Sequence, residues 1–68
     1  MIELDCLGRR CPLPIIELAK AARTAASGEV VRVLADDPAA ANDIAAWCLM
    51  KGHELVRADG TAFDVRIS

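Results

Sequence analysis

All three prolines of this 68-residue chain stand where a helical pattern begins, and this placement constrains the fold more than any other feature. Proline lacks a backbone N–H and holds φ at about −65°, so it suits the first turn of a helix and disrupts later turns. We therefore predict that Pro12 opens one helix with Cys11 at its N-cap, and that Pro38 opens another with Asp37 at its N-cap. The remaining segments must then supply strands and turns.

The first half of the chain has the pattern of a strand followed by a helix. A period of two predicts a half-buried strand that points Ile2, Leu4 and Cys6 inward. From residue 12 to about residue 26, apolar residues recur at helical spacing. The predicted inward stripe of this helix is Ile15, Leu18, Ala19, Ala22 and Ala26. Gly28 then supplies a residue suited to the left-handed conformation that follows many helices.

The middle of the chain repeats this pattern. The β-branched run from Glu29 to Ala35 is almost continuously apolar, which predicts a central strand. The helix opened by Pro38 is predicted to close at Lys51-Gly52, with a favourable cation in its last turn. Its predicted inward stripe is Ala41, Ile44, Ala45 and Cys48.

The last predicted unit is a hairpin. Residues 54–58 and 61–67 flank Asp59-Gly60, a two-residue signal for a type I′ turn, and the second run alternates cleanly. The element order is therefore βαβαββ. Right-handed crossovers place both helices on one face of a mixed four-stranded sheet. We predict a two-layer α/β sandwich that forms a single domain over residues 1–68.

The composition argues against several classes of protein. A net charge of −2, with one Phe, one Trp and no Tyr, argues against direct nucleic-acid binding, which needs a basic surface and benefits from stacking platforms. No apolar run approaches the roughly 18 residues that span a bilayer, and the first five residues lack the pattern of a secretion signal. We therefore expect a soluble cytoplasmic protein with no membrane contact.

The chain has three cysteines, Cys6, Cys11 and Cys48. An odd number without a secretion signal favours reduced thiols over a disulfide framework. With His53 these residues supply enough ligands for zinc, but there is no C-x-x-C knuckle, and proline rather than a flexible chelating loop follows Cys11. The sequence also has no Gly-rich phosphate loop, so we expect neither a metal nor a cofactor.

Cys11 is the candidate nucleophile. At a helix N-cap its sulfur would face free N–H groups and the positive end of the helix dipole, which favour the thiolate. Arg9 and Arg10 add cationic charge beside it. Because Pro14 has no N–H, Leu13 is the predicted backbone donor to the cap. The competing interpretation is a buried cysteine that merely ends a strand, since cysteine is among the most buried residue types.

Other polar and thiol groups have structural interpretations beside catalytic ones. Cys48 is predicted to be a core thiol rather than a catalytic residue. His53, at the predicted start of a strand, is interpreted as a structural or solvated residue rather than a base. The Asp36-Asp37 pair is compatible with a carboxylate dyad, but helix capping explains it without further assumptions.

Several blocks of this sequence together form a known pattern. They are Leu4-Asp5, Gly8-Arg9-Arg10-Cys11-Pro12-Leu13-Pro14, Gly28-Glu29, Ala35-Asp36-Asp37-Pro38, Asp43-Ile44, Cys48 and Gly52-His53-Glu54-Leu55. In order and spacing they resemble the TusA/SirA-like sulfur-carrier family over essentially the whole chain. The resemblance implies a two-layer βαβαββ sandwich, in agreement with the predicted element order.

The resemblance also implies a sulfurtransferase mechanism. The cysteine of the C-P-x-P motif, here Cys11, would accept a sulfane sulfur as a persulfide from a donor such as a cysteine desulfurase or a rhodanese-like protein. It would then pass that sulfur to the cysteine of an acceptor protein. Arg9 and Arg10 would stabilise the thiolate and persulfide anions, and Pro12 and Pro14 would position the motif.

The pathway is not indicated by the resemblance. Family members are associated with 2-thiouridine formation in transfer RNA, molybdenum-cofactor maturation, sulfur oxidation and selenium handling. Many that feed transfer-RNA thiolation have an acidic residue between the prolines, where this chain has Leu13. Cys6 likewise stands where a small residue is more usual. We expect Leu13 to contribute an apolar contact to partner docking.

Two other functions stay open. One is a thiol–disulfide or redox-sensing module in which Cys6 resolves Cys11, although a disulfide needs Cα atoms within about 7 Å and Cys6 is predicted to point inward. The other is a regulatory module that acts through a binding surface without covalent chemistry. Replacement of Cys6 distinguishes the first alternative from sulfur transfer, and replacement of Cys11 distinguishes the second.

Overall fold

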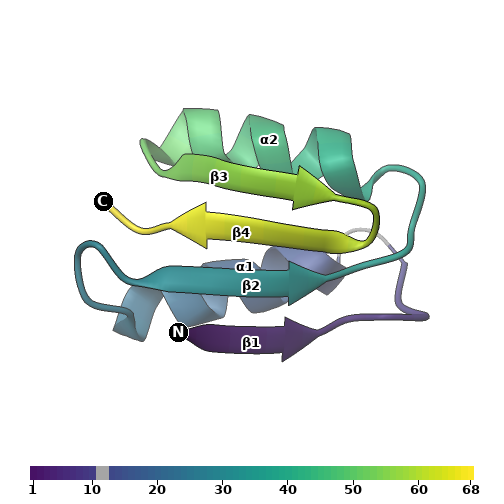
Figure 1. The fold of residues 1–68 in the computed structure, drawn as a ribbon, viewed down its shortest axis with the longest axis horizontal. Helices are drawn as coiled ribbons and strands as arrows, with labels where there is room; N and C mark the ends of the chain where they lie inside the picture. Colours follow the sequence, from purple (N-terminus) through teal and green to yellow (C-terminus); the bar gives the residue numbers. More distant parts are fainter. Residues whose placement is uncertain (11–12) are drawn as a thin grey trace.

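Residues 1–10 and 13–68, which the computed structural model describes, form four strands and two helices in the order βαβαββ (Figure 1). The strands are β1 Ile2–Asp5, β2 Val30–Leu34, β3 Glu54–Asp59 and β4 Ala62–Arg66, and the helices are α1 Leu13–Thr24 and α2 Ala40–Lys51. The element order predicted from the sequence is confirmed.

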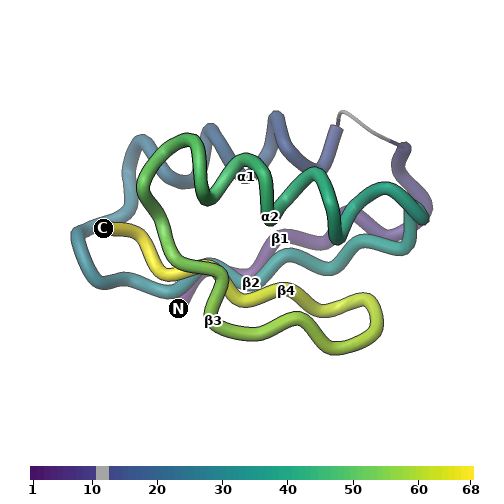
Figure 2. Tube along the Cα trace, turned by 90° about the horizontal axis from the view of Figure 1, so that it is seen from above, coloured from purple at the N-terminus to yellow at the C-terminus, as the bar shows by residue number. Residues whose placement is uncertain are grey.

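The strands form one mixed sheet in the order β1-β2-β4-β3. β1 and β2 run parallel, whereas β4 runs antiparallel to both β2 and β3. Figure 2 shows both helices on the same side of this sheet, which confirms the two-layer α/β sandwich. β2 occupies an interior position, as its apolar run predicted. Within the described chain, neither helix has the length and apolar character needed to cross a membrane.

The core lies between the sheet and the helices. Val31 and Val33 of β2 and Val65 of β4 are fully buried in one cluster with Leu18 of α1 and Ile44 of α2. The other buried apolar members of this cluster are Cys6, Ala35, Ala40, Trp47, Cys48, Phe63 and Ile67. The predicted inward alternation at the two ends of the chain, from Ile2 to Cys6 and from Phe63 to Ile67, is confirmed.

The buried face of α2 is rotated relative to the predicted one. Ala41 and Ala45 were expected to point inward, but both are exposed. The buried residues of the helix are Ala40, Ile44, Trp47 and Cys48. Trp47 is the largest side chain of the helix and only 6% of it is exposed, so its burial turns those two alanines outward. The prediction failed because alanine is small enough to fit on either face.

Each helix is followed by a glycine with positive φ, but α1 is shorter than predicted. It ends at Thr24, and Ala26 is exposed. A carboxylate oxygen of Glu29 accepts the Ala26 N–H at 3.2 Å, and the Glu29 N–H donates to the Ala26 carbonyl at 3.0 Å. A turn therefore replaces the last predicted helical residues. α2 ends at Lys51 as predicted, with Gly52 at a φ of 78°.

The β3–β4 hairpin turns one residue later than predicted. Asp59 pairs with Ala62, so the two loop residues are Gly60 and Thr61. Gly60 has a φ of 61°, and among the described residues only glycines have positive φ. A type I′ turn needs positive φ at both loop residues, whereas a type II′ turn needs it only at the first, where glycine stands. The predicted type I′ turn is therefore wrong, and the backbone fits type II′.

The face of the sheet away from the helices carries charge. Glu3, Arg32, Asp64 and Arg57 are successive cross-strand neighbours over the four strands, so positive and negative side chains alternate. Arg32 donates to both carboxylate oxygens of Asp64, at 2.8 Å from Nε and 3.1 Å from Nη2. These hydrogen bonds hold the pKa of Asp64 below its ordinary value, against the opposing effect of burial. This face is therefore stabilised by ion pairs rather than by apolar packing.

Candidate functional site

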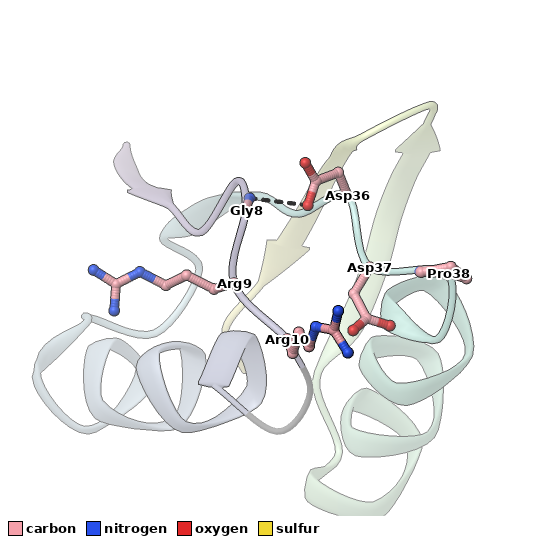
Figure 3. Close-up of a pocket in the computed structure, with 6 residues that line it drawn as sticks. All are labelled: Gly8, Arg9, Arg10, Asp36, Asp37 and Pro38. Carbon is pink, nitrogen blue, oxygen red and sulfur yellow. Dashed lines mark hydrogen bonds between the residues drawn. The ribbon is translucent and has the colours of Figure 1, made fainter.

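The candidate site lies where β1 and β2 end and the chain turns towards the two helices. Parallel strands bring their carboxyl ends to the same edge of a sheet, and such edges are common binding positions in α/β proteins. A cleft of about 510 Å³ opens there between the two connecting loops. Figure 3 shows the residues that line it, which are Gly8, Arg9, Arg10, Asp36, Asp37 and Pro38.

The loop after β1 is fastened to the loop after β2. The Gly8 N–H donates to Oδ1 of Asp36 at 2.9 Å, across 28 residues of sequence (Figure 3). Asp5 accepts the Leu7 N–H through its side chain at 3.1 Å, and the Arg9 N–H donates to the Cys6 carbonyl at 3.1 Å. Three hydrogen bonds therefore hold the segment that leads to the C-P-L-P motif.

The contact between Asp36 and Gly8 was not predicted from the sequence. Both adjacent aspartates were interpreted as capping residues, but a single carboxylate is enough to cap one helix. The extra aspartate was the available signal, although its partner is apparent only once β1 and β2 are known to be neighbours.

Asp37 caps the turn that precedes α2. Its Oδ1 accepts the Ala39 N–H at 2.8 Å, and its carbonyl accepts the Ala40 N–H at 2.9 Å. The helix itself begins at Ala40, and its N-cap is Ala39, which makes no side-chain cap. The prediction that Pro38 is the first helical residue was therefore wrong, because the chain completes a separate capped turn before the helix starts. Its capping carboxylate was correctly identified.

The structure describes the residues on both sides of Cys11 and Pro12. Cys11 and Pro12 themselves lie outside the described residues, as does the prediction that they cap and open the helix. Arg10 and Leu13 are both exposed, with 41% of Leu13 accessible, whereas Pro14 is buried. Exposed residues therefore flank residues 11 and 12 in the sequence, and the last residue of the motif is buried.

The Leu13 N–H donates to the Arg10 carbonyl at 2.9 Å, which closes a backbone turn. The predicted donation of this N–H to Cys11 lies outside the described residues. The two arginines differ: in Figure 3 the Arg10 side chain lies towards Asp37, whereas the Arg9 side chain points away from the aspartates. Arg10 is therefore the cation directed into the cleft.

The thiols of Cys6 and Cys48 are buried in the core. Each is only 2% exposed, and neither is in a disulfide. Burial raises the pKa of both thiols; for Cys6 the charge of Glu17 adds to the rise, and Arg9 only partly opposes it. A protonated, enclosed thiol is a poor nucleophile. The predicted structural role of Cys48 is supported, and the inward position predicted for Cys6 is confirmed.

His53 packs against Trp47. Their ring centroids are 5.1 Å apart, and Nδ1 of His53 accepts the Ser68 N–H at 3.2 Å. Among the described residues, no three or more His, Cys, Asp or Glu side chains come together in a group that would hold a metal ion. Cys6, Cys48 and His53, which were considered with Cys11 as zinc ligands, therefore do not form such a group.

Comparison with known proteins identifies the family. The family model for Sulfurtransferase TusA matches residues 2–68. The crystal structure of the SirA-like protein from Desulfitobacterium hafniense is similar, with a TM-score of 0.73 and 33% sequence identity over 98% of this chain and 95% of that chain. The small two-layer fold is thus that of a sulfur carrier. The chain belongs to the TusA family of sulfurtransferases, which confirms the resemblance seen in the sequence.

Proposed function

We propose that Cys11 carries sulfur between proteins as a persulfide. It accepts a sulfane sulfur from a donor such as a cysteine desulfurase or a rhodanese-like protein, and passes it to the cysteine of an acceptor protein. The observation that carries this assignment is the enclosure of the other two thiols: Cys6 and Cys48 are buried, and their pKa values are raised. Family membership supplies the class of reaction.

In each step of the transfer one S–S bond forms and one breaks, with no net oxidation or reduction. The Cys11 thiolate attacks the terminal sulfur of the donor persulfide, a new S–S bond forms, and the donor cysteine leaves as its thiolate. In the second step the acceptor thiolate attacks the terminal sulfur now on Cys11. The S–S bond between Cys11 and the transferred sulfur breaks, and Cys11 is regenerated as a thiolate. The carrier is unchanged over the cycle, and no outside oxidant or reductant is needed.

Charges near the motif favour the anionic forms that this exchange requires. Arg9 and Arg10 immediately precede Cys11, and both are exposed. No ion pair involves either arginine among the residues that the structure describes. Their positive charge is therefore available to stabilise a thiolate or a persulfide. Arg10 is the one that directly precedes Cys11 in the sequence.

The apolar surface around the motif supports docking of a protein rather than a small substrate. Leu7, Leu13 and Ile16 expose 46%, 41% and 42% of their surfaces, on the loop before the motif and the first turn of α1. Large exposed apolar side chains are common at protein interaction sites. Leu13 is thus proposed as a contact that helps to select the partner.

The redox alternative is disfavoured by the position of Cys6. A resolving cysteine must attack as a thiolate, but burial raises the pKa of Cys6 and only 2% of the residue is exposed. Cys6→Ala should therefore leave persulfide transfer intact. Its loss in that variant would instead support a Cys6–Cys11 redox pair.

Intact-mass measurement after incubation with a cysteine desulfurase and cysteine tests the proposal. The wild-type protein should gain the mass of one sulfur atom, a reductant should remove it, and Cys11→Ser should gain nothing. Failure of the wild-type protein to gain sulfur from several unrelated donors would contradict the proposal. A reducible gain in Cys11→Ser would contradict the assignment to this thiol.

A further inference from the structure

A second hollow lies between the carboxyl-terminal halves of the two helices. It has a volume of about 240 Å³. Its lining residues are Ala19, Ala22 and Arg23 of α1, Trp47 and Lys51 of α2, and His53 after α2. Figure 2 shows that these ends of the helices lie at the opposite end of the molecule from the loops that follow β1 and β2. The hollow is therefore separate from the cleft beside the motif.

The charges that line this hollow are of one sign. Arg23 and Lys51 are exposed cations, and among the described residues neither forms an ion pair. Lys20, one turn before the end of α1, is by contrast paired with Glu17 at 3.5 Å. No aspartate or glutamate is among the lining residues, whereas the cleft beside the motif has two arginines and two aspartates. No side-chain carboxylate among the lining residues therefore competes with an entering anion for Arg23 and Lys51.

His53 adds a hydrogen-bond donor to the same wall. Its Nδ1 accepts the Ser68 N–H, so in the neutral ring the hydrogen resides on Nε2. The Nε2–H of this tautomer is thus a hydrogen-bond donor. Its packing against Trp47 and its bond to Ser68 hold the ring in place. A donor with a fixed ring contributes to binding at a smaller entropic cost than a mobile one.

The floor of the hollow is apolar. Ala19 and Ala22 are half-buried, and only 6% of Trp47 is exposed. Cations in the last turn of a helix also offset its dipole, which explains why Arg23 and Lys51 are basic. It does not explain why both line one hollow with small apolar residues below them. This combination of cationic rim and apolar floor is matched by a negatively charged group on a short hydrocarbon stem.

We propose that this hollow binds a carboxylate on a short apolar stem, with Arg23 and Lys51 holding the carboxylate and the alanines and Trp47 contacting the stem. The volume suits an acid of a few carbons or the side chain of a glutamate, and these two sources share the same chemistry. The α1 residues that line the hollow lie six to ten residues beyond Leu13, which is about 9–15 Å along the helix axis. The proposed binding is therefore separate from the proposed sulfur transfer and can be tested without it.

Trp47 is the only tryptophan of the chain and provides a probe in the hollow itself. Butyrate should produce a saturable change in its fluorescence and in the NMR shift of its indole N–H, whereas the neutral isostere butyramide should not. Arg23→Gln and Lys51→Gln should each weaken binding by about two- to fivefold, as expected for exposed charge pairs. Lys20→Gln, which removes a cation of α1 outside the hollow, should bind like the wild type. All three positions are exposed, so the fold should persist.

The double variant Arg23→Gln/Lys51→Gln lacks both cations of the hollow. Any change in its Trp47 signal on addition of butyrate therefore measures the effect of ionic strength alone. A wild-type response to butyrate no larger than that of the double variant overturns the proposal, as does equal binding of butyramide. A capped glutamate, with its backbone ends blocked, is titrated in parallel. Tighter binding of butyrate identifies a free acid as the source, and tighter binding of capped glutamate identifies an acidic protein side chain. Absence of saturable binding by both rejects the site.

Discussion

The apolar core and the described residues that flank Cys11 in the sequence differ in their exposure to solvent. In the core, Cys6 and Cys48 are each 2% exposed, and burial raises the pKa of both thiols. In the motif, Cys11 stands in sequence between the cationic Arg10 and Leu13, which are both exposed. This comparison is the basis of the proposal that solvation and charge, rather than the thiol group itself, decide which of the three cysteines reacts.

The largest expected effect comes from opening the core that encloses the two unreactive thiols. Ile44 is fully buried in α2, and Ile44→Ala should lower the free energy of unfolding by about 2–5 kcal/mol. A loss of about 3 kcal/mol raises the open population roughly a hundredfold, so alkylation of Cys6 and Cys48 should accelerate by a similar factor. Denaturant unfolding and native-state alkylation measure the two effects.

An exposed leucine on the same helix is the control for the loss of a buried side chain. Leu49 is 86% exposed, and Leu49→Ala should change stability by less than about 0.5 kcal/mol. Unchanged alkylation of Cys6 and Cys48 in a strongly destabilised Ile44→Ala would show that the core is not what protects these thiols.

A smaller loss of stability is expected at the face of the sheet away from the helices, where Arg32 and Asp64 form an ion pair. Asp64→Asn removes the carboxylate that Arg32 holds, and should cost about 1–2 kcal/mol at neutral pH. The pKa of Asp64 is lowered in the folded protein, so its contribution is present above the ordinary carboxyl pKa. It is lost as the pH falls through the lowered value.

The stability difference between wild type and Asp64→Asn should therefore shrink in acid. Denaturant unfolding over a range of pH measures it, with Asp59→Asn as a control, because Asp59 and its partner Arg57 are both exposed. A difference that stays constant down to strongly acidic pH would argue against the ion pair as its origin.

Next in size is the hydrogen bond that fastens the loop before the motif. Asp36→Ala removes the acceptor of the Gly8 N–H and should cost about 1 kcal/mol or less in stability, while persulfide loading slows several-fold as the loop loosens. Asp36→Asn keeps a side-chain oxygen and should restore most of the rate. Equal rates in the alanine and asparagine variants would show that this bond does not position the motif.

The smallest effect is expected on the surface of the motif. Leu13→Glu places a charge on an exposed apolar position and should slow transfer with at least one protein partner by about two- to fivefold, with stability unchanged. Leu13→Gln separates the loss of apolar contact from the added charge. Transfer at the wild-type rate with every donor and acceptor tested would count against a docking role for this residue.

The element order and the inward faces of the strands were predictable because they depend on local periodicity. Alternation from Phe63 to Ile67 and the apolar run of β2 each have a period that suits only one structure. The register of α2 was less certain because Ala41 and Ala45 fit on either side of a helix, and the burial of Trp47 decided it. The hairpin was displaced by one residue because Gly60 fits either position of a two-residue turn.

Two residues that line the cleft, Arg9 and Arg10, were singled out from the sequence, but the arrangement of the cleft was not predictable. Charges beside a cysteine are visible in the sequence, so Arg9 and Arg10 were recognised. The bond from Gly8 to Asp36 joins distant residues and depends on the pairing of β1 with β2. The cationic hollow was missed for a similar reason: Arg23 and Lys51 each have a local explanation at a helix end, and only helix packing brings them to one site.

The most direct test of the account locates the transferred sulfur among the three thiols. The protein is loaded by a cysteine desulfurase, persulfides and thiols are blocked by an alkylating reagent, and peptides are analysed by mass spectrometry. The account predicts the additional sulfur on the peptide that contains Cys11, with Cys6 and Cys48 recovered as ordinary thiols after unfolding. Additional sulfur on the Cys6 or Cys48 peptide, with none on the Cys11 peptide, would contradict it.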